Sequence, residues 1–598
     1  MSDLARLTPP FEPLAPLALG SAERQAADIL RRRRLIVLSV NLVTYLVLAA
    51  AMAAVVGAGG WTAIDTALFI GFLIAAPWTV LGFWNAAIGL WLLHGRADGM
   101  RQVAPFAASA DSAEPIHLRI AVLMTLRNEE PGRAFARLRA VKASIEATGE
   151  GALFAYFILS DTSVAEVATA EEAAVAAWRC DVAEPERIVY RRRADNAGYK
   201  AGNLRDFCER WGRSYDLMLP LDADSLMTGA AILRLARIMQ AHPRIGILQS
   251  LVVGTPSRSA FARIFQFGMR HGMRAYTMGS TWWIGECGPF WGHNALVRIA
   301  PFVEHCHLPV LPGGPPLGGH VLSHDQVEAT LMRKAGYEVR ILPEEGGSWE
   351  DNPPTLLEFS RRDLRWCQGN MQYLKLLDLP GLKLMSRFQL AWAILMFVGV
   401  PAMTLMIALV PLKFFDGEDL STFPSGLAIG VYVTFLTMYL SPKLAGLADI
   451  LLSDDGVRGY GGTGRFLASA AIEIVFSFLL GAVATFRIAL FMIGLPFGRA
   501  VVWNGQARDA HGISWSTAVK GLWPPFLFGC AICGALAWLS PAVLLWSLPL
   551  TFGYLVAVPF AVATASPAFG EALARRRLCA VPEELAEPPE IRAVRQNA

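Results

Sequence analysis

The chain has little charge for its length. Of its 598 residues, 17% are Asp, Glu, Lys or Arg and 54% are hydrophobic, whereas soluble proteins carry about 25% charged residues. This shortage of charge predicts that part of the chain lies in lipid. The formal net charge is only +3, so the composition gives no support to nucleic-acid binding, which usually needs a concentrated basic surface.

Cysteine is also scarce. The chain has eight cysteines without regular spacing, which argues against a disulfide framework and fits reduced thiols in a cytosolic compartment. Cys530 and Cys533 form a CxxC pair inside an apolar run. We interpret this pair as small packing residues rather than as metal ligands or a redox centre.

Long apolar runs, in contrast, are abundant. Two of them, 35–58 and 64–93, predict a pair of transmembrane helices, because a spanning helix needs about 20 mainly apolar residues. Five further candidates follow near the C-terminal end, at 388–412, 426–440, 466–495, 519–539 and 541–565.

Basic residues predict the orientation of these spans. Four arginines at 31–34 precede the first span and three at 575–577 follow the last, so both termini are expected in the cytosol of a bacterial inner-membrane protein. This orientation requires an even number of crossings, yet there are seven candidates. The run 466–495 contains Glu473 and Arg487 and is expected to include an interfacial or re-entrant helix.

The apolar pattern divides the chain into five parts. They are a cytosolic N-terminal segment (1–34), two transmembrane helices (35–96), a cytosolic domain (97–386), a region of transmembrane and interfacial helices (387–565) and a cytosolic C-terminal tail (566–598).

Strand and helix patterns alternate in the cytosolic domain. Strands are predicted at 118–126, 154–159, 187–190, 217–221 and 245–251, with helices at 134–148, 165–179, 201–211 and 229–241. Such alternation predicts a parallel, doubly wound, Rossmann-like α/β sheet. Ligands of these sheets bind beyond the carboxyl ends of the strands.

Polar clusters follow several of the predicted strands. Lys200, among small residues at a helix start, suits a phosphate group. Asp222 and Asp224, one residue apart after a strand, suit a hard cation such as Mg²⁺ or Mn²⁺. Each motif is weak by itself, because a lone DAD can simply cap a helix or form a turn. The order of the clusters carries more weight.

That order resembles the family 2 glycosyltransferases of the GT-A fold, particularly the membrane-embedded processive ones such as cellulose and hyaluronan synthases. Three stretches are most similar to the glucosyltransferases of periplasmic glucan biosynthesis: GPFWGHNALVR, LSHDQVEATLMRKAGYEV and RRDLRWCQGN. The resemblance covers about residues 115–375 and implies a GT-A domain inserted in a polytopic α-helical membrane region.

For the donor, the resemblance implies uridine contacts from Asp161 and from the loop that holds Thr125, Asn128 and Glu129. Lys200 would contact the diphosphate, and the two aspartates of the DAD motif would engage UDP and its metal ion.

For the acceptor, Asp325 stands where the family's TED motif keeps its general base. Arg365 and Trp366 match the end of the QxxRW motif, where tryptophan stacks on the acceptor sugar. Trp291 and His293 lie where the family lines the acceptor end. Two departures are visible: Arg362 replaces the QxxRW glutamine, and Ser323-His324-Asp325 replaces TED.

The activity implied is processive, inverting transfer of glucose from UDP-glucose to a growing glucan chain. In-line attack assisted by a separate carboxylate base inverts the anomeric centre. The subfamily further implies a β-1,2 linkage, export across the inner membrane, and acyl carrier protein and a periplasmic glucan-processing protein as partners.

Two other interpretations stay open. One is another membrane β-glycan synthase such as cellulose synthase, although these often carry a C-terminal cyclic-di-GMP domain and residues 566–598 are too few for a typical domain. The other is a catalytically silent membrane regulator. Retention of Asp222, Asp224, Asp325 and Trp366 argues against that interpretation.

Overall fold

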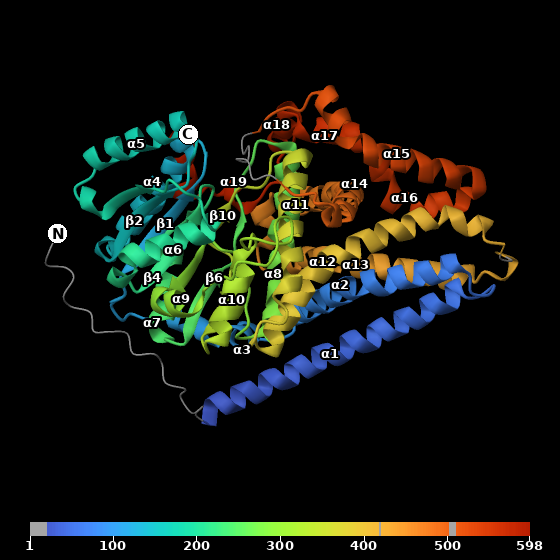
Figure 1. Ribbon diagram of the computed structural model, residues 1–598, viewed down its shortest axis with the longest axis horizontal. Coiled ribbons are helices and arrows are strands. Elements are labelled where there is room, and N and C mark those ends of the chain that lie inside the picture. Colours follow the sequence, from blue (N-terminus) through green and yellow to red (C-terminus); the bar gives the residue numbers. More distant parts are fainter. Residues whose placement is uncertain (1–20, 418–419, 502–509, 598) are drawn as a thin grey trace.

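The computed structural model describes residues 21–417, 420–501 and 510–597. A sheet domain lies at one end of the molecule and long helices extend away from it (Figure 1). Of the predicted segment 1–34, residues 1–20 lie outside the described part, and the remainder begins helix α1 (Ser21–Val56). Helix α2 (Ala63–His94) packs against α1 and returns to the sheet domain.

The sheet domain is built on seven strands in the order β3-β2-β1-β4-β8-β6-β9. Their apolar sequences, such as IAVLMTL and FAYFILS, are buried almost throughout because helices cover both faces. The strands are β1 (Ile120–Leu126), β2 (Phe154–Ser160), β3 (Ile188–Arg192), β4 (Leu217–Asp222), β6 (Ile245–Ser250), β8 (Ala295–Arg298) and β9 (Glu338–Leu342).

One strand corrects the prediction of a parallel sheet. Strand β8 runs antiparallel to both β4 and β6, whereas the other pairings in this sheet are parallel. After β6 the chain passes through a long helix and re-enters the sheet from the opposite side. Residues 290–294 therefore precede β8 at the edge where the parallel strands end, so this short strand places the FWGHN segment at the ligand-binding edge.

Two helical layers enclose the sheet. Helices α4 (Pro131–Glu146), α5 (Ala165–Cys180) and α7 (Gly229–Ala241) share one apolar core with the strands. Helices α6 (Tyr199–Trp211), α9 (Ile299–His305) and α10 (His324–Lys334) share the other. A small second sheet, β5 (Leu226–Met227), β10 (Ser348–Glu350) and β7 (Val253–Gly254), extends the binding edge.

Helix α8 (Ala260–Ile284) joins the sheet domain to the membrane region and lies within the segment 97–386 that was predicted as the cytosolic domain. It packs against α2 and α13 and separates them from the sheet (Figure 1). Glycines allow this approach: a Cβ on Gly89 would lie 1.7 Å from the Ala275 carbonyl oxygen, and one on Gly279 1.8 Å from that of Asn85. Small residues at helix crossings let backbones touch.

Six helices of the described part are long and apolar enough to cross a membrane, and a bent pair forms a further candidate. The six are α1, α2, α12 (Leu384–Leu409), α13 (Ser425–Leu452), α14 (Thr463–Gly494) and α15 (Trp515–Leu539). The bent pair is α16 (Pro541–Leu555) with α17 (Ala557–Ala565), which meet at 58° within the predicted span 541–565.

Helix α14 differs in direction from its neighbours. It is one continuous helix rather than a span plus a separate interfacial helix. Figure 1 looks nearly along α14, whereas α2, α12 and α13 run across the picture. Glu473 is buried in it and forms an ion pair with Lys443 of α13, so its charge is compensated within the protein.

The predicted C-terminal tail, 566–598, folds back onto the sheet domain over its described residues. It forms α18 (Pro567–Arg575), α19 (Pro582–Leu585) and α20 (Pro589–Asn597). Glu584 forms an ion pair with the buried Arg263 of α8, with 2.6 Å between Oε2 and Nη1. Ile591 and Val594 join the apolar core of the sheet, so this segment ties α8 to the sheet domain.

Candidate active site

A large cavity, about 810 Å³, opens at the C-terminal edge of the sheet and continues between α8, α12 and α2. Nearly all the predicted site residues line it: Thr125, Glu129, Asp161, Lys200, Asp222, Asp224, Trp291, His293, Asp325, Arg362, Arg365 and Trp366. The exception is Asn128, whose Oδ1 accepts hydrogen bonds from the backbone N–H groups of Ser163 and Val164. Asn128 therefore joins two loops of the cavity rim.

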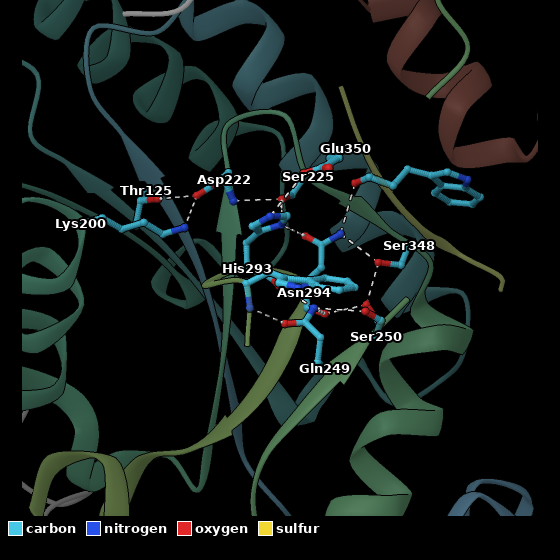
Figure 2. A network of polar contacts seen from close by, with 12 residues as sticks. Thr125, Lys200, Asp222, Ser225, Gln249, Ser250, His293, Asn294, Ser348 and Glu350 are labelled. Atoms are coloured by element: carbon cyan, nitrogen blue, oxygen red, sulfur yellow. Dashed lines mark hydrogen bonds and ion pairs between the residues drawn. The ribbon is translucent and has the colours of Figure 1, made fainter. Parts of the chain in front are cut away.

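One end of the cavity concentrates charge around the DAD motif. Lys200 Nζ forms an ion pair with Asp222 Oδ1, and Thr125 Oγ1 donates a 3.4 Å hydrogen bond to the same oxygen (Figure 2). Ser225 Oγ accepts a 3.0 Å bond from the Asp222 backbone N–H. Asp224 is buried beside them. A lysine and two carboxylates at a strand end suit a metal-bound diphosphate.

Asp161 has a partner that the sequence motifs did not reveal. Its two carboxylate oxygens pair with Arg193, at 2.7 Å from Nε and 2.6 Å from Nη2. Such a bidentate pair fixes the carboxylate in one orientation at the cavity wall. Three consecutive arginines at 191–193, where the third strand ends, were the available signal.

Asp325 lies in the first turn of α10, half-buried, with its Oδ1 accepting a 2.9 Å bond from the Gln326 backbone N–H. Gly292 packs directly against it: a Cβ there would lie 3.4 Å from Asp325 Cβ, and φ at Gly292 is +78°. This positive φ favours glycine. The FWGHN segment and the candidate base are thus in contact.

The residue before Asp325 is a buried histidine. His324 Nδ1 lies 2.9 Å from Glu328 Oε2, one helical turn away. Burial alone would lower the pKa of His324, but the Glu328 and Asp325 carboxylates together outweigh burial and hold that pKa above its ordinary value. The pair anchors the helix start from which Asp325 projects.

Helix α11 (Leu356–Met371) supplies the QxxRW-like residues. Trp366 is 50% exposed toward the cavity, and the Arg362 guanidinium stacks 4.6 Å from its ring centroid. Arg362 also lies 5.3 Å from the ring of Phe359. Burial lowers the pKa of Arg362, while Asp363 and Glu350 oppose that shift. Arg362, which stands at the glutamine position of the QxxRW motif, therefore holds the Trp366 ring in place through a cation–π contact.

A polar network connects the DAD motif with β10 (Figure 2). His293 Nδ1 lies 3.4 Å from Ser225 Oγ, and His293 Nε2 lies 3.3 Å from Glu350 Oε2. Asn294 extends the network to Ser348 through a 2.9 Å bond. The sequence motifs gave no indication of Glu350, which follows an apolar residue in a short strand.

The opposite end of the cavity is aromatic and lies among the long helices. Trp78 of α2 stacks on Trp392 of α12 with ring centroids 5.5 Å apart, and Phe388 stacks on the same ring at 5.5 Å. Trp283 of α8 meets Phe388 edge to face. The sequence placed three of these side chains in apolar runs, where nothing distinguished them from lipid-facing aromatics.

Known proteins resemble the chain over nearly its full length. The model of Glycosyl transferase family group 2 matches residues 217–433. A glucans biosynthesis glucosyltransferase H of Xanthomonas campestris is 34% identical over 99% of this chain and 95% of its own length. That of Caulobacter vibrioides is 37% identical over 90% of this chain and 82% of its own length.

Among solved structures, a mannosyltransferase of Pyrobaculum calidifontis in complex with GDP-Man and Mn²⁺ is 14% identical, with a TM-score of 0.35. It matches 62% of this chain and 99% of its own length. This likeness is too low to support a conclusion about the present chain.

Proposed function

Because this chain belongs to the glucans biosynthesis glucosyltransferases, we propose that it is a processive, inverting transferase that takes glucose from UDP-glucose. The proposed product is the β-1,2-linked backbone of a periplasmic glucan. One observation carries the proposal: a single cavity joins the charged DAD end, the carboxylate of Asp325 and the aromatic end among the long helices.

The charged end suits the leaving diphosphate. Lys200 already faces Asp222, and Arg365 lies on the same cavity. Two carboxylates without a third His, Cys, Asp or Glu ligand among the described residues fit Mg²⁺ or Mn²⁺, which takes its other ligands from phosphates and water. A divalent cation held by Asp222 and Asp224 supplies positive charge for the departing UDP. Lys200 adds a second positive charge there.

The acceptor side supplies the base and the binding face. Asp325 takes the proton from the attacking hydroxyl of the acceptor, while the anomeric C–O bond to UDP breaks on the opposite face of the sugar. Because the hydroxyl attacks the face opposite the departing UDP, the anomeric centre is inverted. Trp366 offers an apolar face for the acceptor ring, and Arg362 keeps that face in place.

The aromatic end suits passage of the product into the membrane region. Stacked rings such as Trp78 and Trp392 offer flat apolar surfaces on which successive sugar rings can slide. In this proposal, α14 lies along the membrane surface, which leaves six crossings and both termini in the cytosol. Acyl carrier protein and a periplasmic glucan-processing protein complete the proposal as partners.

The test is nucleotide-sugar turnover by the purified full-length protein in lipid nanodiscs. UDP release is measured with UDP-glucose, UDP-galactose and UDP-N-acetylglucosamine, each with Mg²⁺, Mn²⁺ or chelator, and any polymer is analysed for its linkage. We expect metal-dependent turnover of UDP-glucose to a β-1,2 glucan. A polymer with another linkage would refute the product assignment alone. No turnover of any donor would favour the silent regulator instead.

A further inference from the structure

Glu350 is an acidic residue of the cavity that has no role in the proposed binding of the donor. It ends strand β10, lines the cavity and has a side chain that is 25% exposed. The neighbouring carboxylate of Asp351 also lines the cavity, but its side chain is only 9% exposed, and its Oδ2 lies 2.6 Å from Arg133 Nη2 and 2.7 Å from Arg137 Nη2. The two arginines of α4 therefore engage Asp351 and anchor the strand to that helix, while the more exposed Glu350 carboxylate extends into the cavity.

Glu350 is held between two residues of the acceptor side. His293 Nε2 lies 3.3 Å from its Oε2, and the Arg362 guanidinium is close enough to interact electrostatically with it. His293 is adjacent to Gly292, which packs against Asp325. The carboxylate is thus linked to the candidate base through His293 and Gly292, and it interacts with the guanidinium that stacks on Trp366.

The chemistry of Glu350 suits a neutral ligand. A carboxylate that faces the diphosphate without a bound cation would repel it, and the positive charge for that group lies at Lys200, beside Asp222, instead. A carboxylate beside an aromatic face is, in contrast, a good acceptor of hydrogen bonds from sugar hydroxyls, and such charge-assisted bonds are strong and directional. Trp366 provides the face and Glu350 the acceptor.

We propose that Glu350 is a specificity-determining residue that binds hydroxyl groups of the terminal acceptor sugar and so fixes which hydroxyl faces Asp325. The inference rests on the proposed function. His293 and Arg362 act as positioning residues, because they hold the carboxylate in one orientation. The Glu350 carboxylate thereby sets both the affinity for the growing chain and the uniformity of its linkage.

The experiment compares Glu350→Gln with wild type and with Glu344→Gln, using full-length protein in nanodiscs. Glu344 is a matched control, because it precedes the same strand but pairs with Arg234 outside the cavity. The assay supplies UDP-glucose, Mg²⁺ and a short β-1,2 glucan primer. It measures the Kd of UDP, the KM and kcat for the primer, and the linkages of the product.

We expect Glu350→Gln to keep the UDP Kd within about twofold and to raise the primer KM about ten- to a hundredfold, as loss of a charged hydrogen bond implies. A second linkage should appear in its product, and Glu350→Asp should recover part of the primer affinity. Glu344→Gln should behave as wild type.

Three results would overturn the inference. The first is a Glu350→Gln protein with the primer KM and linkage of wild type. The second is parallel loss of UDP affinity and thermal stability in this variant, which would make Glu350 a structural residue. The third is a wild-type protein that turns over no UDP-glucose; this result alone refutes the proposed function as well, so the two failures can be told apart.

Discussion

The crossing of α2 and α8 gives the sharpest structural prediction. Gly89 of α2 touches the backbone of α8, where an added Cβ would lie 1.7 Å from the Ala275 carbonyl oxygen and 3.0 Å from the Gly279 nitrogen. Gly82, two turns earlier on the same helix, has nothing within 4 Å of its Cβ position. Gly89→Ala and Gly82→Ala are therefore the same substitution in one helix with opposite surroundings.

The expected cost follows from the distances. A carbon normally approaches a carbonyl oxygen no closer than about 3.3 Å, so Gly89→Ala must push the helices apart by roughly 1.6 Å. Overpacking of this kind destabilises by about 1–3 kcal/mol or more. The shift also strains the 2.9 Å hydrogen bond from Trp283 Nε1 to Asn85 Oδ1, and both residues line the cavity.

The assay is thermal unfolding of detergent-purified protein together with UDP release. Gly89→Ala should unfold at a lower temperature than wild type and lose turnover, while Gly82→Ala should match wild type or exceed its stability, because alanine favours a helix over glycine. Equal unfolding temperatures and turnover for the two variants would refute the close crossing.

Three further predictions concern single side chains. Lys200→Met should weaken binding of UDP with Mg²⁺ by about ten- to a hundredfold in calorimetry, because a charged contact to the diphosphate is lost; unchanged affinity would contradict the assignment. Glu584→Ala should cost about 3 kcal/mol in unfolding, since it leaves Arg263 buried and unpaired, whereas Glu587→Ala should cost little, because its partners Arg592 and Arg595 are exposed. The third is a pH dependence: burial lowers the pKa of His271 to about 3, and neither ring nitrogen has a hydrogen-bond partner among the described residues. Below about pH 6.5 the His271 side chain is therefore protonated in the unfolded chain but not in the folded protein, so stability should fall as the pH drops from 6.5 toward 3. His271→Leu should flatten that slope in denaturation curves measured between pH 7 and 4. An unchanged slope would contradict this prediction.

Much of the fold could be predicted from local patterns. Apolar runs of spanning length marked the membrane helices, and the alternation of strands and helices marked the Rossmann-like core up to β6. The predictions failed where a non-local contact decides the structure. Strand β8 is only four residues long, and its antiparallel direction depends on the path of the chain through α8 before it re-enters the sheet. Helix α8 carries several polar residues, so its packing against the membrane helices α2 and α13 could not be predicted from its sequence.

The residues of the candidate site likewise fall into those that local patterns predict and those that depend on non-local contacts. Asp161 and Asp222 lie at the ends of strands and Lys200 lies in the first turn of α6, so their place on the cavity could be predicted because the ends of parallel strands converge. Arg193 and Glu350 could not be, since their roles depend on side-chain partners distant in sequence, Asp161 and His293 respectively. The aromatic end of the cavity was hidden for another reason: three of its rings lie in runs in which lipid contact already accounts for aromatic residues.

The most direct test of the account is the turnover of Asp325→Asn beside its equilibrium binding of UDP. This variant keeps the size and hydrogen bonds of the side chain but removes the base. We expect UDP with Mg²⁺ to bind as tightly as to wild type, while release of UDP from UDP-glucose falls by about 10²–10⁴-fold. Turnover within a fewfold of wild type would contradict the assignment of Asp325 as the base and with it the proposed mechanism.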